Sequence, residues 1–179
     1  MLKYPHLFEP IRIGGTMFKN RLFASPISGR TMDSMGRPNN DYIAFYEQKA
    51  IGGIASVCVG DCVVDSKHGM FGEPMTRMDD PNYERPLNLL SAAIRRHGAV
   101  ASVELQHAGM YANLSRAKGE IVYGPCDGED ASGNVYREMP EEMIERTIAA
   151  YAAAAARAKA CGFNMVTLHG GHGWLLAQF

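Results

Sequence analysis

The feature that most constrains the fold is a regular alternation of short apolar segments with longer amphipathic ones. The apolar segments have strand length, and they are residues 21–28, 54–60, 99–106 and 165–168. Three segments with helical periodicity lie between them, beginning near Asn39–Asp41, Asp80–Pro81 and Pro140–Glu142 and ending near Gly52–Gly53, Gly98 and Gly162. Strands alternating with helices predict parallel strands joined by helical crossovers, which is the α/β class.

Two further segments flank this pattern. Residues 10–14 and 16–20 surround Gly14–Gly15, which predicts a β-hairpin before the first strand. The first strand is expected to be buried and to end at Pro26, because proline cannot donate to a ladder. His107–Glu138 is too long for a simple connection and is interpreted as a lid or binding loop. In the last helix, the expected buried face comprises Ile144, Ile148, Tyr151, Ala152 and Ala155.

The four expected strands fit a barrel better than an open dinucleotide-binding sheet. A Rossmann half should show GxGxxG after its first strand, but here that strand ends in Pro26-Ile-Ser-Gly-Arg30. A (β/α)8 barrel takes about 250 residues. Four strands and three helices make about half of one. We therefore expect residues 1–179 to be the N-terminal portion of one TIM-barrel domain, truncated after strand four.

Composition excludes several classes of function. The net charge is −1, which argues against nucleic-acid and membrane-surface partners. No apolar run approaches the roughly 20 residues of a membrane span, and the first residues lack a signal peptide's apolar core, so cytoplasm is the expected location. Cys58, Cys62, Cys126 and Cys161 form no CxxC pair, which favours free thiols over a metal site.

The final segment carries the most suggestive chemistry. The expected strand Met165–Leu168 runs into a loop with His169, His172 and three glycines. Two imidazoles on a backbone loosened by glycine can converge on one small ligand at the carboxyl end of a strand. A Gly-rich turn with two incidental histidines is the alternative.

Taken in order, several segments of the chain resemble the Old Yellow Enzyme family of FMN-dependent ene-reductases, in the branch with bacterial 2,4-dienoyl-CoA reductases and bile-acid-inducible NADH:flavin oxidoreductases. The segments are Leu7-Phe8-Glu-Pro-Ile, Lys19-Asn20-Arg21, Ser25-Pro26, Gly52-Gly53, Gln106-His107-Ala-Gly109, Gly162-Phe163, His169-Gly-Gly-His172-Gly, Leu175 and Gln178-Phe179. The resemblance implies an FMN-binding (β/α)8 barrel, with the flavin across the carboxyl ends of the strands.

The resemblance also assigns roles to individual residues. It implies that the flavin is contacted by the loop after strand one, by a small residue ending strand two and by a glutamine ending strand three. Those positions are Ser25, Pro26, Ile27, Ser28, Gly60 and Gln106. A side-chain amide is both donor and acceptor, as a flavin's uracil-like edge requires. His169 and His172 match the residues that bind the carbonyl oxygen of an enone substrate. NAD(P)H would supply the hydride through FMN.

Two departures from the family pattern leave alternatives open. Trp174 stands where relatives usually carry a proton-donating tyrosine, and Met110 stands where they tend to have arginine. One alternative is a metal-dependent TIM-barrel hydrolase that uses His169 and His172 with Glu104 or His107. Another is an inactive truncated fragment. An iron–sulfur cluster and FAD, as in longer relatives, would belong to a missing C-terminal part, and the isolated chain is expected to aggregate or form a homo-oligomer.

Overall fold

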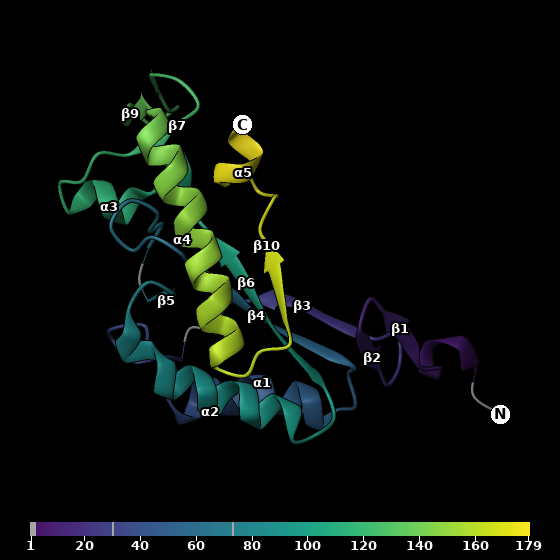
Figure 1. Ribbon diagram of the computed structural model, residues 1–179. Helices are drawn as coiled ribbons and strands as arrows, with labels where there is room; N and C mark the ends of the chain where they lie inside the picture. The colour runs from purple at the N-terminus through teal and green to yellow at the C-terminus, as the bar shows by residue number, and fades with distance from the viewer. Residues whose placement is uncertain (1–2, 30, 73) are drawn as a thin grey trace.

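A parallel sheet forms the centre of the molecule. The computed structural model describes residues 3–29, 31–72 and 74–179. In this part of the chain the sheet has the order β10-β6-β4-β3, and the short β5 (Thr76–Arg77) pairs with β4. The main strands are β3 (Phe23–Ile27), β4 (Ser56–Val63), β6 (Val100–Gln106) and β10 (Met165–Leu168), all paired in parallel. The predicted α/β class and the predicted strands are thus confirmed (Figure 1).

Helices α1 and α2 form where the sequence predicts them. In α1 (Asn40–Ile51), Asn39 caps the first turn by accepting a hydrogen bond from the Tyr42 N–H at 2.9 Å. Its inward side chains are Tyr42, Tyr46 and Ala50. A 3₁₀ turn, η2 (Pro81–Tyr83), leads into α2 (Glu84–Arg95). The apolar side chains of α2 that face inwards, Leu87, Leu90, Ala93 and Ile94, are all buried.

The third crossover helix, α4 (Glu141–Ala160), has the predicted bounds, but its predicted buried face is wrong in part. Ile148 is 58% exposed, and the buried residues are Thr147, Ala154 and Ala158. Small side chains let the helix approach the sheet closely. The larger Ile144 and Ile148 instead line an apolar groove with Leu175, Leu176 and Phe179.

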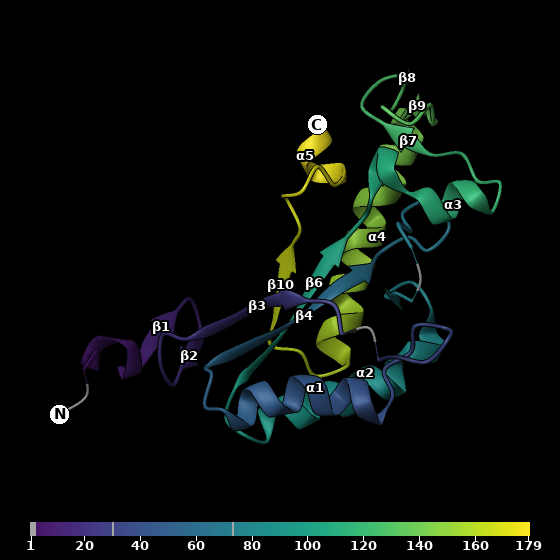
Figure 2. The same ribbon diagram turned by 180° about the vertical axis from the view of Figure 1, so that it is seen from behind.

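The N-terminal hairpin is confirmed. Strands β1 (Ile11–Ile13) and β2 (Thr16–Phe18) pair antiparallel, after the short 3₁₀ turn η1 (Pro5–Phe8). Phe18 is buried against Ala55 and Val100, at the amino ends of β4 and β6. The hairpin therefore lies near the end of the sheet opposite to the carboxyl ends of the strands (Figure 2).

Strand β3 differs from the buried strand that was predicted. Its residues alternate between exposed and half-buried, because in the described chain β3 pairs with β4 alone and forms an edge. Pro26 lies inside the strand, between the paired residues Ala24 and Ile27, where the register shifts. A proline is tolerated there because an edge strand with an irregular ladder does not need its N–H.

The segment predicted as a long lid or binding loop has secondary structure of its own. It contains η3 (Gly109–Tyr111), α3 (Asn113–Ala117), and the strands β7 (Tyr123–Gly124), β8 (Gly128–Glu129) and β9 (Val135–Glu138). β9 pairs with both other strands, so the segment is a small three-stranded excursion beyond the end of β6. The short helix α5 (Leu175–Gln178) was also not predicted. None of the helices in the described residues is long and apolar enough to cross a membrane.

Candidate functional site

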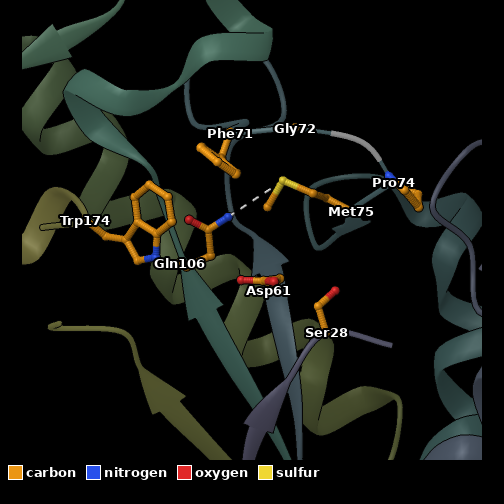
Figure 3. Close-up of a pocket in the computed structure, with 8 residues that line it drawn as sticks. All are labelled: Ser28, Asp61, Phe71, Gly72, Pro74, Met75, Gln106 and Trp174. Atoms are coloured by element: carbon orange, nitrogen blue, oxygen red, sulfur yellow. Dashed lines mark hydrogen bonds between the residues drawn. The ribbon is translucent and has the colours of Figure 1, made fainter. Parts of the chain in front are cut away.

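Two adjoining cavities lie at the carboxyl ends of the central strands. One has a volume of about 180 Å³ and is lined by Ser28, Asp61, Phe71, Gly72, Pro74, Met75, Gln106 and Trp174 (Figure 3). The other, of about 280 Å³, is lined by Pro26, Ser28, Asp61, Glu104, His169, His172 and Trp174. Ser28, Asp61 and Trp174 belong to both walls. The two cavities therefore make one polar site with two compartments.

The loop after β3 is held in place by a tyrosine of α1. The Tyr46 hydroxyl donates to the Ile27 carbonyl and accepts from the N–H groups of Gly29 and Gly60, at 3.3 and 3.4 Å. Of the four residues predicted here, Pro26 and Ser28 face the cavities, whereas Ser25 and Ile27 alternate to the exposed side. Tyr46 was not predicted as part of the site, because in the helical pattern it has the position of an ordinary core aromatic residue.

Gly60 is needed by the sheet itself. A Cβ at this position would lie 2.9 Å from the backbone nitrogen of Ile27, so the close approach of β3 and β4 requires glycine. The next residue, Asp61, adopts φ +55° at an irregularity in the pairing of β4 with β6. This left-handed conformation is uncommon for a residue other than glycine, and it often marks a functional position. Asp61, which was not predicted as a site residue, faces both cavities.

Gln106 occupies the wall of the first cavity with an incomplete set of hydrogen bonds. It is 1% exposed, and its Nε2 lies 3.9 Å from the Met75 sulfur, a weak acceptor. Its Oε1 is buried, and no hydrogen-bond partner is found for it among the described residues. A buried amide oxygen without a partner is costly and indicates a ligand group that would donate to it.

Glu104, two residues earlier on β6, faces the second cavity. It is 7% exposed, and the Asp61 N–H approaches its Oε2 at the long distance of 3.5 Å. Burial raises the pKa of Glu104 above its ordinary value, whereas the nearby rings of His169 and His172 act in the opposite direction. The site thus holds a carboxyl group whose charged form is disfavoured.

The two predicted histidines are brought together, but they bind each other. The Gly171 N–H donates to His169 Nδ1 at 3.2 Å, so this nitrogen carries no proton. In the neutral ring the proton of His169 is then on Nε2, which lies 3.1 Å from His172 Nδ1 and donates to it. The neutral ring of His172 accordingly keeps its proton on Nε2, so the pair offers one N–H that has no partner among the described residues.

The histidine loop is tied down despite its place near the last residue. The Leu175 N–H donates to the His107 carbonyl at 3.0 Å. Gln178 Nε2 donates to the carbonyls of Ala108 and Gly173, and its Oε1 accepts from the Met110 N–H. Gly109 has φ +58°, and a Cβ there would overlap the Gln178 side chain. Hydrogen bonds of the Gln178 side chain therefore join the loop after β6 to the loop after β10.

Trp174 forms an aromatic wall. Its ring centroid lies 5.2 Å from that of Phe71 and 6.2 Å from that of His169. Figure 3 shows the indole on the same side of the cavity as Gln106 and Phe71. This ring shields one side of both compartments.

His107 does not belong to the histidine site. It is 1% exposed, its Nδ1 accepts from the Gly109 N–H at 3.0 Å, and Gly69 packs against its ring. Burial lowers the pKa of His107 to about 4, so the ring is neutral at pH 7. Within the described chain, no group of three or more His, Cys, Asp or Glu side chains could hold a metal ion. The hydrolase alternative therefore has no ligand set there.

A parallel α/β sheet with polar cavities at its carboxyl ends is the arrangement of the cofactor-binding barrel enzymes. A profile of the NADH:flavin oxidoreductase / NADH oxidase family matches residues 6–179. The chain belongs to this family.

Individual relatives agree with this assignment. The chain is 33% identical over 175 residues to a metal reductase of Desulforamulus reducens, covering 97% of this chain and 25% of that protein. It is 29% identical over 174 residues to an NADPH dehydrogenase of a Geobacillus species, covering 97% of this chain and 50% of that protein. The chain thus spans about a quarter to a half of such relatives.

Solved structures show the same fold. The amine oxidase for 6-hydroxypseudooxynicotine from Pseudomonas geniculata superimposes with a TM-score of 0.84 at 29% identity, over 98% of this chain and 26% of that one. The Old Yellow Enzyme of a Pichia species gives 0.85 at 23% identity, over 96% of this chain and 47% of that one. The predicted half of a TIM barrel and the predicted family are both confirmed.

Proposed function

We propose that this protein is an FMN-dependent oxidoreductase that passes hydride from NAD(P)H, through FMN, to the C=C bond of an α,β-unsaturated carbonyl compound. The observation that carries the proposal is Gln106, whose buried amide oxygen has no partner among the described residues and lies in a cavity that adjoins the histidine pair. The family membership supports the flavin, because the matching profile is that of NADH:flavin oxidoreductases.

The residues present fit a flavin. The uracil-like edge of the isoalloxazine ring alternates carbonyl acceptors with an N–H donor, and the Gln106 amide supplies the complementary acceptor and donor. Pro26 and Ser28, fixed through Tyr46, would form the wall on the β3 side, and Ser25 and Ile27 continue the same backbone. When bound, FMN would supply the hydride chemistry, which belongs to the cofactor.

The histidine pair would act on the substrate. The free Nε2–H of His172 is suited to donate to a carbonyl oxygen, and His169 holds that ring in the required tautomer. The donated hydrogen bond draws electron density from the conjugated C=C bond and stabilises the charge that develops on oxygen. The indole of Trp174 would exclude water but could not serve as an acid, because its N–H has no accessible acidity near neutral pH.

The proposal is tested by reconstitution and by separate half-reactions. The complete protein, as distinct from residues 1–179 prepared alone, should take up FMN and show a flavin absorption spectrum, and NAD(P)H should bleach that spectrum. An enone such as cyclohexenone should restore it. Replacing both His169 and His172 with alanine should slow only the restoration, whereas His97→Ala, on the far side of the fold, should change neither step.

Amine oxidation is the informative comparison reaction, because the similar P. geniculata structure is that of an amine oxidase. An amine that bleaches the flavin while enones fail to restore it would overturn the proposed direction but keep the flavin. Failure to bind FMN under any condition would overturn the proposal as a whole.

A further inference from the structure

We propose that Met75 is a modification site, at which hydrogen peroxide oxidises the thioether sulfur to methionine sulfoxide and thereby weakens ligand binding beside Gln106. The step transfers one oxygen atom: the sulfur gives an electron pair to a peroxide oxygen, the O–O bond breaks, and water leaves. The source of the oxidant rests on the proposed function, because hydrogen peroxide forms when dioxygen takes two electrons and two protons from a reduced flavin.

The first argument is the position of the sulfur atom. Met75 is only 6% exposed, yet it lines the cavity of about 180 Å³ at the carboxyl ends of the strands. Its side chain points towards Gln106, and its sulfur lies 3.9 Å from Gln106 Nε2 (Figure 3). A cavity of this volume has room for several water-sized molecules, and hydrogen peroxide is little larger than water. The oxidant can therefore reach this buried sulfur from the site.

Other buried methionines lack this access. Met32, Met70 and Met78 are 8%, 1% and 1% exposed, and they line neither compartment of the site. Met70 belongs to the same apolar cluster as Met75. Burial thus predicts slow oxidation of these three sulfur atoms, whereas the cavity predicts faster oxidation of Met75. Met70 provides the internal comparison.

The second argument is hydrogen bonding. The contact found for Gln106 Nε2 is with the Met75 sulfur, and a thioether is a weak acceptor. A sulfoxide is polar and carries much of its negative charge on oxygen, so it accepts a hydrogen bond far better. Oxidation therefore converts a weak contact into a strong hydrogen bond inside the cavity, and this bond stabilises the product.

The backbone of Met75 holds the side chain in the cavity wall. Gly36 has φ +80°, and a Cβ at that position would overlap the Met75 carbonyl group, so the loop before α1 packs directly on Met75. The next residue, Thr76, begins β5, which pairs with β4. With its backbone fixed on both sides, Met75 keeps the new oxygen atom in the cavity.

The consequence for the site is a loss of ligand affinity after oxidation. The sulfoxide oxygen occupies the N–H donor of Gln106 and adds volume where a flat ligand would lie. The loss of one hydrogen bond of this kind predicts a fall of about tenfold in the affinity for a flavin. Methionine sulfoxide reductases remove the oxygen again, so the modification is reversible. Accumulated peroxide would thus slow the reaction that forms it.

The experiment exposes the complete protein, free of flavin, to hydrogen peroxide and follows each methionine-containing peptide by mass spectrometry. We expect the sulfoxide to form at Met75 about tenfold faster than at Met70, because only the former lines the cavity. FMN should protect Met75 and leave Met17, which is 59% exposed and reports the strength of the oxidant, unprotected. Equal rates at Met75 and Met70 would overturn the proposal.

Two variants test the effect on binding. Riboflavin dissociation constants are measured by fluorescence before and after peroxide treatment. Wild type should lose about tenfold in affinity, and a methionine sulfoxide reductase with dithiothreitol should restore it. Met75→Leu should keep its own untreated affinity, whereas the matched control Met70→Leu should lose affinity as wild type does. A Met75→Leu variant that is as sensitive to peroxide as wild type would contradict the role of Met75.

The outcomes separate this inference from the proposed function. If the untreated protein binds neither riboflavin nor FMN, the proposed function fails, while selective oxidation of Met75 in the mass spectra would still support the modification site. If flavin binds and Met75 resists peroxide as Met70 does, the modification site fails and the flavin enzyme stands.

Discussion

The hydrogen bonding of the buried Gln106 side chain indicates that it binds a ligand. In the described part of the chain its amide oxygen has no hydrogen-bond partner, and its amide nitrogen contacts the sulfur atom of Met75. Substituting leucine removes the amide while keeping the volume similar. We expect Gln106→Leu to weaken FMN binding by about 1–3 kcal/mol, because the flavin edge would lose its partner. A titration followed by flavin fluorescence measures this, and Met75→Leu is the control that removes only the sulfur contact. Equal affinity and equal redox potential in the leucine variant would remove Gln106 from the site.

The histidines make unequal contributions in this geometry. His172 carries the free N–H, whereas His169 orients it. His172→Ala should therefore slow flavin reoxidation by an enone about as much as the double replacement does, by about 10²–10³-fold, the usual effect of removing one such donor. His169→Ala should cost less, since His172 can still donate. Stopped-flow absorbance separates the variants, and equal losses in both single variants would favour two converging donors.

At the scale of the element, α1 holds the strand ends of the site in place through hydrogen bonds of Tyr46. Tyr46 satisfies three backbone groups of the two strand ends that meet at the cavities. Tyr46→Phe would leave these buried groups unpaired, and we expect the free energy of unfolding to fall by about 1–3 kcal/mol. Tyr42→Phe is the matched control, because the contacts found for the Tyr42 hydroxyl are with the side chains of Tyr46 and Thr76 and not with strand backbone groups. Urea denaturation measures both, and an equal effect of the two changes would contradict the role given to Tyr46.

Elements with strong local signals could be predicted from the sequence, and those defined by distant contacts could not. Asn39 marks a helix end through its capping side chain, and Pro140 and Gly162 do so through their backbone preferences, so the bounds of α1 and α4 could be predicted. The buried face of α4 could not be predicted, because Ile144 and Ile148 line a groove with Leu175 and Phe179, which are distant in sequence, and do not face the sheet. The strands of the His107–Glu138 segment are two to four residues long, too short for a periodic pattern.

The same distinction applies to the site. His169, His172 and Gln106 could be recognised in the sequence as candidates, because they are polar residues at or just after the ends of apolar strands. Asp61 and Tyr46 could not, since their roles depend on a strand irregularity and on a loop that only the folded chain brings close. The flavin cofactor was predicted from the resemblance of short motifs to a known family, because the spacing of residues alone could not identify it.

At the scale of the whole molecule, the sheet has two open edges in the described chain. β3 pairs only with β4, and β10 only with β6, while Ile27 and Leu168 at these edges are 56% and 58% exposed. Open parallel edges favour association with further strands, and the loops after strands seven and eight, which commonly bind phosphate in such barrels, lie outside this sheet.

We therefore expect residues 1–179, prepared alone, to aggregate or dimerise and to hold FMN poorly. Size-exclusion chromatography with multi-angle scattering tests the first expectation, and the absorbance of the eluted peak tests the second. A monomeric, yellow preparation that reduces an enone would contradict both.

The place of Trp174 has a practical consequence for following this chain in solution. It is the only tryptophan of the sequence, and it lies in the wall shared by both compartments. Tryptophan emission would thus come from a single chromophore positioned where the ligand would arrive, and flavins absorb light in the range of that emission. Occupancy of the site should be readable by resonance energy transfer from the native protein, without attaching a dye.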